Sequence, residues 1–146
     1  MRMTLLAVVA MTSLLGCGEE DVRDCPLALY LNGVGIELDG ERSTAGAYEL
    51  RMHVGDRTWG LCSFEVPTPE DGSFVCSGET EWHATGDGWE DVESVQLTVT
   101  PDVFTVTLTR DGDVVAEQTY TPEYEVTEPN GEGCGEHISA RVTFSW

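Results

Sequence analysis

The most constraining feature of this sequence is a strict alternation of apolar and polar side chains in two segments. In residues 48–54, Tyr, Leu, Met and Val occupy every second position, with Glu, Arg and His between them. Residues 136–146 repeat the pattern with Ile, Ala, Val, Phe and Trp. Successive side chains of a strand point to opposite faces of a sheet, so both segments predict strands with one buried and one wet face.

Shorter strand-like runs fill most of the remaining chain, and clusters of Gly, Pro, Asn and Asp separate them. No segment after the first 17 residues has helical periodicity of useful length. Many short strands with frequent turns indicate an all-β sandwich or barrel, and we expect an antiparallel β-sandwich. The shorter runs cover residues 27–31, 34–38, 59–66, 73–77, 79–84, 92–100 and a hairpin at 103–120.

The hairpin is centred on Asp111-Gly112, and its register has two alternatives. A two-residue turn would place Leu108 opposite Val115. A three-residue loop ending with Gly112 in the left-handed conformation would place Leu108 opposite Val114. The second register keeps more apolar residues on one face, so we expect it.

The first 16 residues have the plan of a secretory signal peptide. Arg2 provides a positive start, and an apolar run follows from residue 3 to residue 15. The run is shorter than the ~20 apolar residues that a membrane-spanning helix needs, and an acidic stretch follows it directly. We therefore expect a cleaved signal rather than a membrane span.

The end of this run, Leu14-Leu15-Gly16-Cys17, resembles the lipobox of bacterial lipoproteins. The resemblance implies that the Cys17 thiol carries a diacylglyceryl group and that a signal peptidase cuts after Gly16. The new amino terminus would accept a further acyl chain such as palmitate. Two acyl chains hold a protein stably on a membrane, where one does not. The alternative is an ordinary signal peptide that happens to contain a cysteine.

Residues 17–24 form a short acidic tether, which reaches only about 25 Å when fully extended. The folded part is therefore expected close to a membrane. Gly18 is not the aspartate that retains lipoproteins in the inner membrane of enteric bacteria. By that resemblance we expect the outer membrane, with the protein facing the periplasm or the cell surface.

Four cysteines remain once Cys17 is assigned to the lipid, and an even number in an exported domain indicates two disulfides. Three pairings are possible. Cys62 and Cys76 flank one loop, so we expect them to pair, which leaves Cys25 with Cys134. A zinc site is the alternative, but the chain has no C-x-x-C spacing.

The charge of the chain is strongly acidic, with a formal net charge of −20 and no lysine. This argues against nucleic-acid binding, because neutralising phosphates requires basic patches. It also argues against electrostatic docking on anionic lipid headgroups. A solvated acidic surface is the simplest interpretation.

The strand rhythm of residues 25–146 resembles the small immunoglobulin-like or transthyretin-like β-sandwiches of exported bacterial lipoproteins. The resemblance implies one such domain after the signal peptide (1–16) and the tether (17–24). It implies no activity.

The most unusual segment is residues 82–91, in which two tryptophans flank a Gly-rich turn. Trp82, His83, Asp87 and Trp89 are candidate ligand-binding residues, because aromatic faces beside polar groups can hold a sugar or a peptide. The acids of the segment could also supply oxygen ligands to Ca²⁺, although the EF-hand pattern is absent. The alternative is that both tryptophans pack on the core.

No short segment carries a catalytic motif. The sequence lacks G-x-S-x-G, H-E-x-x-H and a Gly-rich phosphate loop, and His53 and His137 fall on the polar faces of the alternating strands. We expect a non-catalytic binding or surface module without a cofactor. One alternative is a calcium- or carbohydrate-binding domain that uses residues 82–91. The other is a hydrolase whose site is assembled from distant residues.

Overall fold

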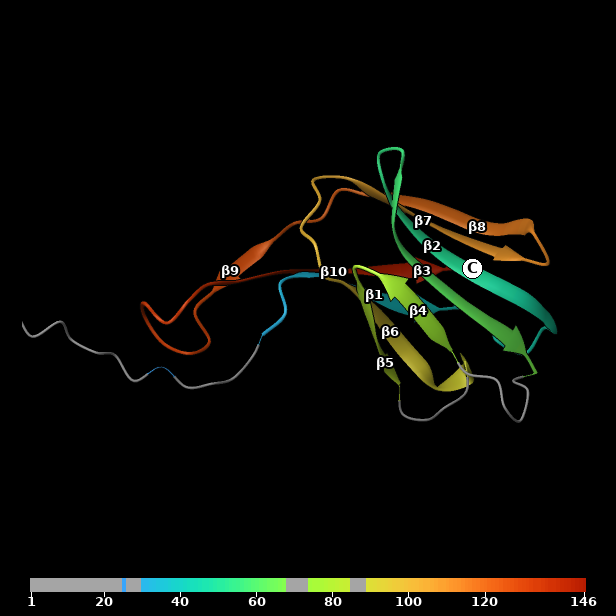
Figure 1. The fold of residues 1–146 in the computed structure, drawn as a ribbon, viewed down its shortest axis with the longest axis horizontal. Helices are drawn as coiled ribbons and strands as arrows, with labels where there is room; N and C mark the ends of the chain where they lie inside the picture. Colours follow the sequence, from blue (N-terminus) through green and yellow to red (C-terminus); the bar gives the residue numbers. More distant parts are fainter. Residues whose placement is uncertain (1–24, 26–29, 68–73, 85–88) are drawn as a thin grey trace, which may run out of the picture.

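The molecule consists of two five-stranded β-sheets, which confirms the predicted β-sandwich (Figure 1). The structure, a computed structural model, describes residue 25 and residues 30–67, 74–84 and 89–146, with backbone alone at 82–84 and 90. Sheet A has the strand order β5-β6-β1-β10-β9, and sheet B has the order β4-β3-β2-β7-β8. The strands are β1 (Gly33–Asp39), β2 (Gly46–Val54), β3 (Arg57–Val66), β4 (Val75–Gly78), β5 (Thr80–Ala84), β6 (Val92–Leu97), β7 (Phe104–Arg110), β8 (Asp113–Tyr120), β9 (Glu125–Thr127) and β10 (His137–Ser145).

Strand pairing is antiparallel throughout both sheets except between β1 and β10, which run parallel. One short 3-10 turn, η1 (Trp89–Asp91), precedes β6. The described part of the chain contains no helix that is long and apolar enough to cross a membrane.

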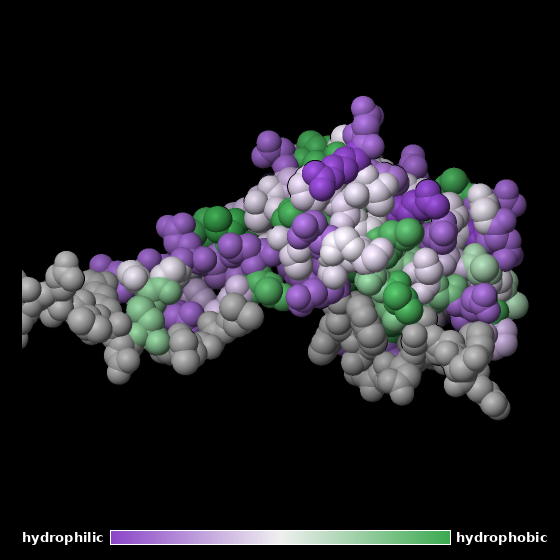
Figure 2. Space-filling view, viewed as in Figure 1, coloured by the Kyte–Doolittle hydropathy of each residue, from purple (hydrophilic) through white to green (hydrophobic). Residues whose placement is uncertain are grey.

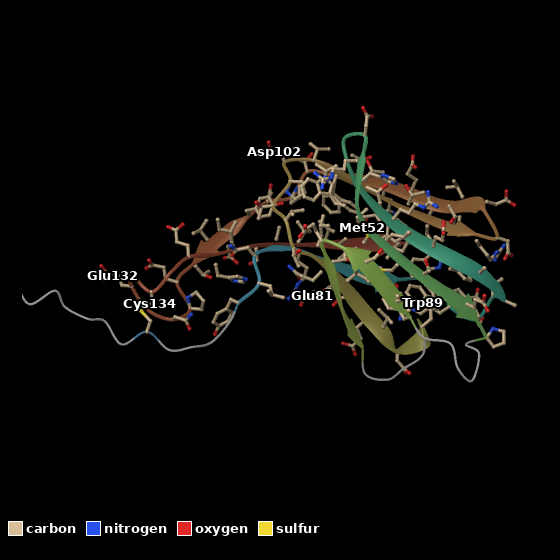
Figure 3. All side chains as sticks on the ribbon, in the orientation of Figure 1. Met52, Glu81, Trp89, Asp102, Glu132 and Cys134 are labelled. Atoms are coloured by element: carbon tan, nitrogen blue, oxygen red, sulfur yellow. A yellow bond between two sulfur atoms is a disulfide. The ribbon has the colours of Figure 1, made fainter. Side chains whose placement is uncertain are left out.

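The core lies between the two sheets and follows the alternation of the sequence. In β2, Tyr48, Leu50 and Met52 are buried, and the intervening Arg51 is exposed. Each fully buried side chain of this size contributes roughly 1.5–3 kcal/mol relative to leaving it in water. Met52 lies inside the body in Figure 3, as does the indole of Trp89.

One side of the sandwich is closed where the chain passes directly from β4 to β5 and so changes sheets. Gly78 has a φ of +87°, and a Cβ there would lie 2.3 Å from the carbonyl oxygen of Trp59. The next amide, that of Glu79, donates to the same carbonyl at 2.7 Å. Only glycine allows this close approach of two backbones.

The opposite side is closed by side chains of β8 that reach β10 at residues 143 and 145, beyond the part of β10 that pairs with β9. Gln118 Nε2 donates to the carbonyl of Ser145 at 2.9 Å, and the Tyr120 hydroxyl donates to the carbonyl of Thr143 at 2.8 Å. Unpaired strand edges attract other strands, and these bonds occupy part of such an edge.

The register predicted for the hairpin between β7 and β8 is wrong. Arg110 pairs with Asp113 across a two-residue turn, in which Asp111 and Gly112 have φ values of +52° and +89°. A bulge between Leu108 and Thr109 then shifts the ladder, so that Leu108 lies opposite Ala116. The bulge keeps Leu108 in the core while the turn remains tight.

Both predicted disulfides are confirmed, and they lie in different surroundings. Cys62 and Cys76 are paired neighbours on β3 and β4, with Cα atoms 4.1 Å apart. The Cα atoms of Cys25 and Cys134 are 5.5 Å apart. This second bond lies at the tip of an arm, defined here as residues 125–138 with Cys25, that projects from the sandwich (Figures 1 and 3).

Two predicted strands differ from the structure at their ends. The run at 92–100 ends as a strand at Leu97. In the run at 27–31, positions 27–29 lie outside the described residues, and residues 30 and 31 are not in a strand.

Candidate functional site

A groove runs along the outer face of sheet A, above the central strand β1. The side chains of Val34 and Ile36 point into the core, so Gly35 between them faces outward. Its neighbours in register are Gln96 on β6 and Arg141 on β10. Because glycine has no side chain, these two residues become the walls of a groove whose floor is the β1 backbone. We call this feature the β1 groove.

The fold itself does not require glycine at position 35. A Cβ added there would lie 3.5 Å from Oε1 of Gln96 and 3.8 Å from the carbonyl oxygen of Ala140, which are ordinary contacts. Gly78 differs, because its φ and the nearby carbonyl of Trp59 exclude a side chain. Glycine inside a strand weakens it, and such a glycine often marks a place where another group approaches closely.

The β1 groove consists of two adjoining hollows of about 730 and 540 Å³, which share Gly35, Gln96 and Arg141 as lining. These volumes are in the range typical of small-ligand sites. The side chain of Arg141 is 78% exposed, and its guanidinium lies 3.5 Å from the Glu37 carboxylate. A pair this exposed contributes little to stability, so the guanidinium is accessible to other acceptors.

The end of the groove nearest the arm is bordered by Glu123, Tyr124, Glu125 and His137. Tyr124 donates its hydroxyl to the carbonyl of Pro101 at 2.8 Å. Burial, with a smaller contribution from a nearby aspartate, raises the pKa of Tyr124 to about 12. The hydrogen bond to Pro101 holds the Tyr124 ring at this end of the groove.

The opposite end is bordered by Glu37, Glu93 and Arg42. Arg42 donates to the carbonyls of Leu38 and Val92, and its guanidinium lies 5.3 Å from the centre of the Trp89 ring. Burial lowers the pKa of Arg42, against the charges of two nearby acids. Its contacts point into the fold, so Arg42 closes the groove mainly as a structural residue.

Of the ligand-binding residues predicted in segment 82–91, only Trp89 has a described side chain. Trp89 is 1% exposed and stacks on Phe64 with ring centroids 3.7 Å apart, so its ring offers no free face to a ligand. The backbone register places Trp82 opposite Val95 and His83 opposite Ser94. Asp87 lies outside the described residues.

The remaining titratable candidates are dispersed. His53 lies on β2 in sheet B, with Nδ1 3.3 Å from the hydroxyl of Thr58. His137 lies on β10 in sheet A, where its Nε2 is 2.9 Å from the carbonyl of Leu31. Among the described residues, no three His, Cys, Asp or Glu side chains are grouped in a way that could hold a metal ion.

Cys17, at which the sequence predicts a lipid, and the predicted tether fall outside the described residues, and the first residue described after them is Cys25 at the tip of the arm. Sequence reasoning missed the β1 groove. The available signal was the run Gly33-Val-Gly35-Ile, in which glycines alternate with buried aliphatic residues. The pairing with Arg141 could not be read from the run.

Comparisons of this chain with protein-family models, with curated proteins and with solved structures find no match.

Proposed function

We propose that this chain is a lipid-anchored, non-catalytic binding module of the bacterial cell envelope. The lipobox-like sequence ending at Cys17 supports the anchor, and the β1 groove supports binding. One structural observation connects them. The Cys25–Cys134 bond attaches the end of the tether to the tip of the arm, at the pole of the molecule farthest from most of the sandwich (Figure 1).

This arrangement suits an anchored protein. The tether between Cys17 and Cys25 is too short to let the arm tip move far from the lipid. The arm then separates the sandwich from the membrane surface. The net charge of −20 repels the protein from anionic lipid headgroups. The face seen in Figure 2 has hydrophilic residues along the arm and across the body, and its hydrophobic residues form small separate groups. By the sorting resemblance at Gly18, we place the module on the outer membrane.

Metabolic labelling with an alkynyl palmitate tests the anchor. The full chain is produced in a diderm bacterium beside the variants Cys17→Ser and Cys25→Ser. We expect label and membrane association in the wild type and in Cys25→Ser, and neither in Cys17→Ser. Separation of the two membranes by density then checks the outer-membrane assignment. Label that persists in Cys17→Ser, or a wild type without label, would overturn the anchor.

A further inference from the structure

The shape of the β1 groove favours an elongated ligand. Its floor is a central strand, with β6 on one side and β10 on the other. Neighbouring strands lie ~4.8 Å apart, so the two walls stand roughly 10 Å apart. The two hollows follow each other along β1, one toward Glu125 and the other toward Glu93. A chain one residue wide, laid along the strand, would fill this space.

The backbone of the floor is not available to a peptide. Residues of β1 hydrogen-bond to β10 on one side and to β6 on the other. Peptides that bind sheets by main-chain hydrogen bonds add to an open edge. A ligand in the β1 groove must therefore be recognised by side chains alone.

The side chains in the groove include both donors and acceptors. Arg141 can only donate, Glu37 and Glu125 accept, and Gln96 does both. A hydroxyl group donates and accepts at once, so a polyol can satisfy all of them. Tyr124 adds an aromatic ring at the arm end, beside which the apolar face of a sugar can pack.

The mixed charges of the lining disfavour an elongated ligand that carries many charges of one sign. A polyanion would be repelled by a protein of net charge −20. A polycation would be attracted by the glutamates that border both ends of the groove, but the exposed guanidinium of Arg141 would repel it at the centre. We propose that the β1 groove binds a neutral oligosaccharide chain laid along β1, with Arg141 and Gln96 hydrogen-bonding its hydroxyl groups at the centre. This inference rests on the proposed function as a binding module, and it names the ligand class.

The test uses the full chain in detergent micelles. The probes are neutral linear glucose and N-acetylglucosamine oligomers of four to six units, a polygalacturonate fragment and a lysine-rich peptide. Binding is measured by calorimetry and by amide chemical shifts. We expect a neutral oligomer to bind, with the largest shifts at Gly35 and Gln96, and the acidic and basic probes to bind at least tenfold more weakly.

Variants locate the site. Gly35→Leu fills the floor and should abolish binding, and Arg141→Ala should weaken it at least tenfold. Arg51→Ala is the matched control, because Arg51 pairs with Glu49 on the outer face of sheet B and should bind as the wild type does. Arg141→Ala changes only an exposed side chain, so it provides the decisive result if Gly35→Leu does not fold.

Three outcomes would overturn the proposal. These are no binding of any neutral oligomer at millimolar concentration, preferential binding of the peptide or the polyanion, and unchanged binding by folded Arg141→Ala. The palmitate experiment is independent of all three. A labelled protein that binds no glycan refutes the ligand class, and an unlabelled protein that binds glycan refutes the anchor.

Discussion

The body and the arm of this molecule are held together in different ways. Among the described residues, the body buries 17 apolar side chains between two sheets. In the arm, none of residues 125–138 is buried, and the side chain of Val126 is 57% exposed. The strand β9 makes only three pairs with β10. The arm is an exposed ribbon, closed at its tip by the bond between Cys25 and Cys134.

This difference assigns different roles to the two disulfides. The Cys62–Cys76 bond joins strands that already pair, beside a core in which Cys62 is fully buried. The Cys25–Cys134 bond lies where burial contributes almost nothing. A two-stranded ribbon alone is at best marginally stable in water, so the cross-link takes the place of a core in the arm.

The largest loss of stability is expected when a buried side chain is removed from the core of the body. Trp89→Ala removes a ring that stacks on Phe64 and is also covered by Phe74 and Arg42. Truncation of a buried tryptophan costs about 3–5 kcal/mol. Urea denaturation should show this loss in the free energy of unfolding. Tyr30→Ala, at a ring that is 47% exposed beside the arm, is the control and should cost under ~1 kcal/mol. Equal losses of stability in the two variants would contradict the view that burial stabilises the body and not the arm.

Removal of the short disulfide, Cys62–Cys76, should cause the second largest loss of stability. In the chain-entropy account, a loop of this length contributes about 3 kcal/mol by restricting the unfolded chain. The double variant Cys62→Ala, Cys76→Ala should lose approximately that much, with the same fold by circular dichroism. A loss below ~1 kcal/mol would show that β3 and β4 hold each other without the bond.

Removal of the long disulfide should have a smaller global effect and a larger local one. The same account allows up to ~4.7 kcal/mol for a loop of about a hundred residues. The double variant Cys25→Ser, Cys134→Ser should lose less free energy of unfolding than the double variant Cys62→Ala, Cys76→Ala. The reason is that the freed arm also gains conformational entropy in the folded state, which offsets part of the loss. Hydrogen exchange should accelerate in Glu125–Thr127 and stay slow in Val106–Leu108. Slow exchange that persists in β9 would show that the arm is stable without its cross-link.

The body was largely predictable from the sequence, and the reason is local. The alternation in 48–54 requires only that one face of β2 be buried, and Cys62 could be paired with Cys76 because the two flank one loop. The hairpin register depended on a bulge at Leu108 that keeps this side chain in the core. The burial of Trp89 depended on Phe64, which lies on another strand. Such features follow from tertiary packing, which no local pattern contains.

The β1 groove was not predictable for a topological reason. Gly35 and Arg141 lie far apart in the sequence and meet because β1 pairs with β10, in the parallel direction. Antiparallel neighbours were expected throughout. The projection of the arm has a similar origin, since β10 begins before the first residue of β1 and has only β9 as a partner there.

The smallest expected effect concerns the junction of arm and body, where Tyr124 donates to the carbonyl of Pro101. Tyr124→Phe removes this hydrogen bond and should cost about 0.5–1.5 kcal/mol.

The junction should also give a pH dependence with a defined sign. The pKa of Tyr124 is raised to about 12 by burial, whereas an unfolded tyrosine titrates near 10. The folded state therefore holds this proton more tightly, so the associated stability is complete below about pH 10 and declines as the pH rises toward 12. Part of this decline should disappear in Tyr124→Phe and part should remain, because burial also raises the pKa of Tyr120. The decline can be followed by urea denaturation midpoints at pH 9, 10 and 11. The proteins compared are the wild type, Tyr124→Phe and the control Tyr30→Phe. If both variants change the slope equally, Tyr124 is not the group that couples the arm to the body at alkaline pH.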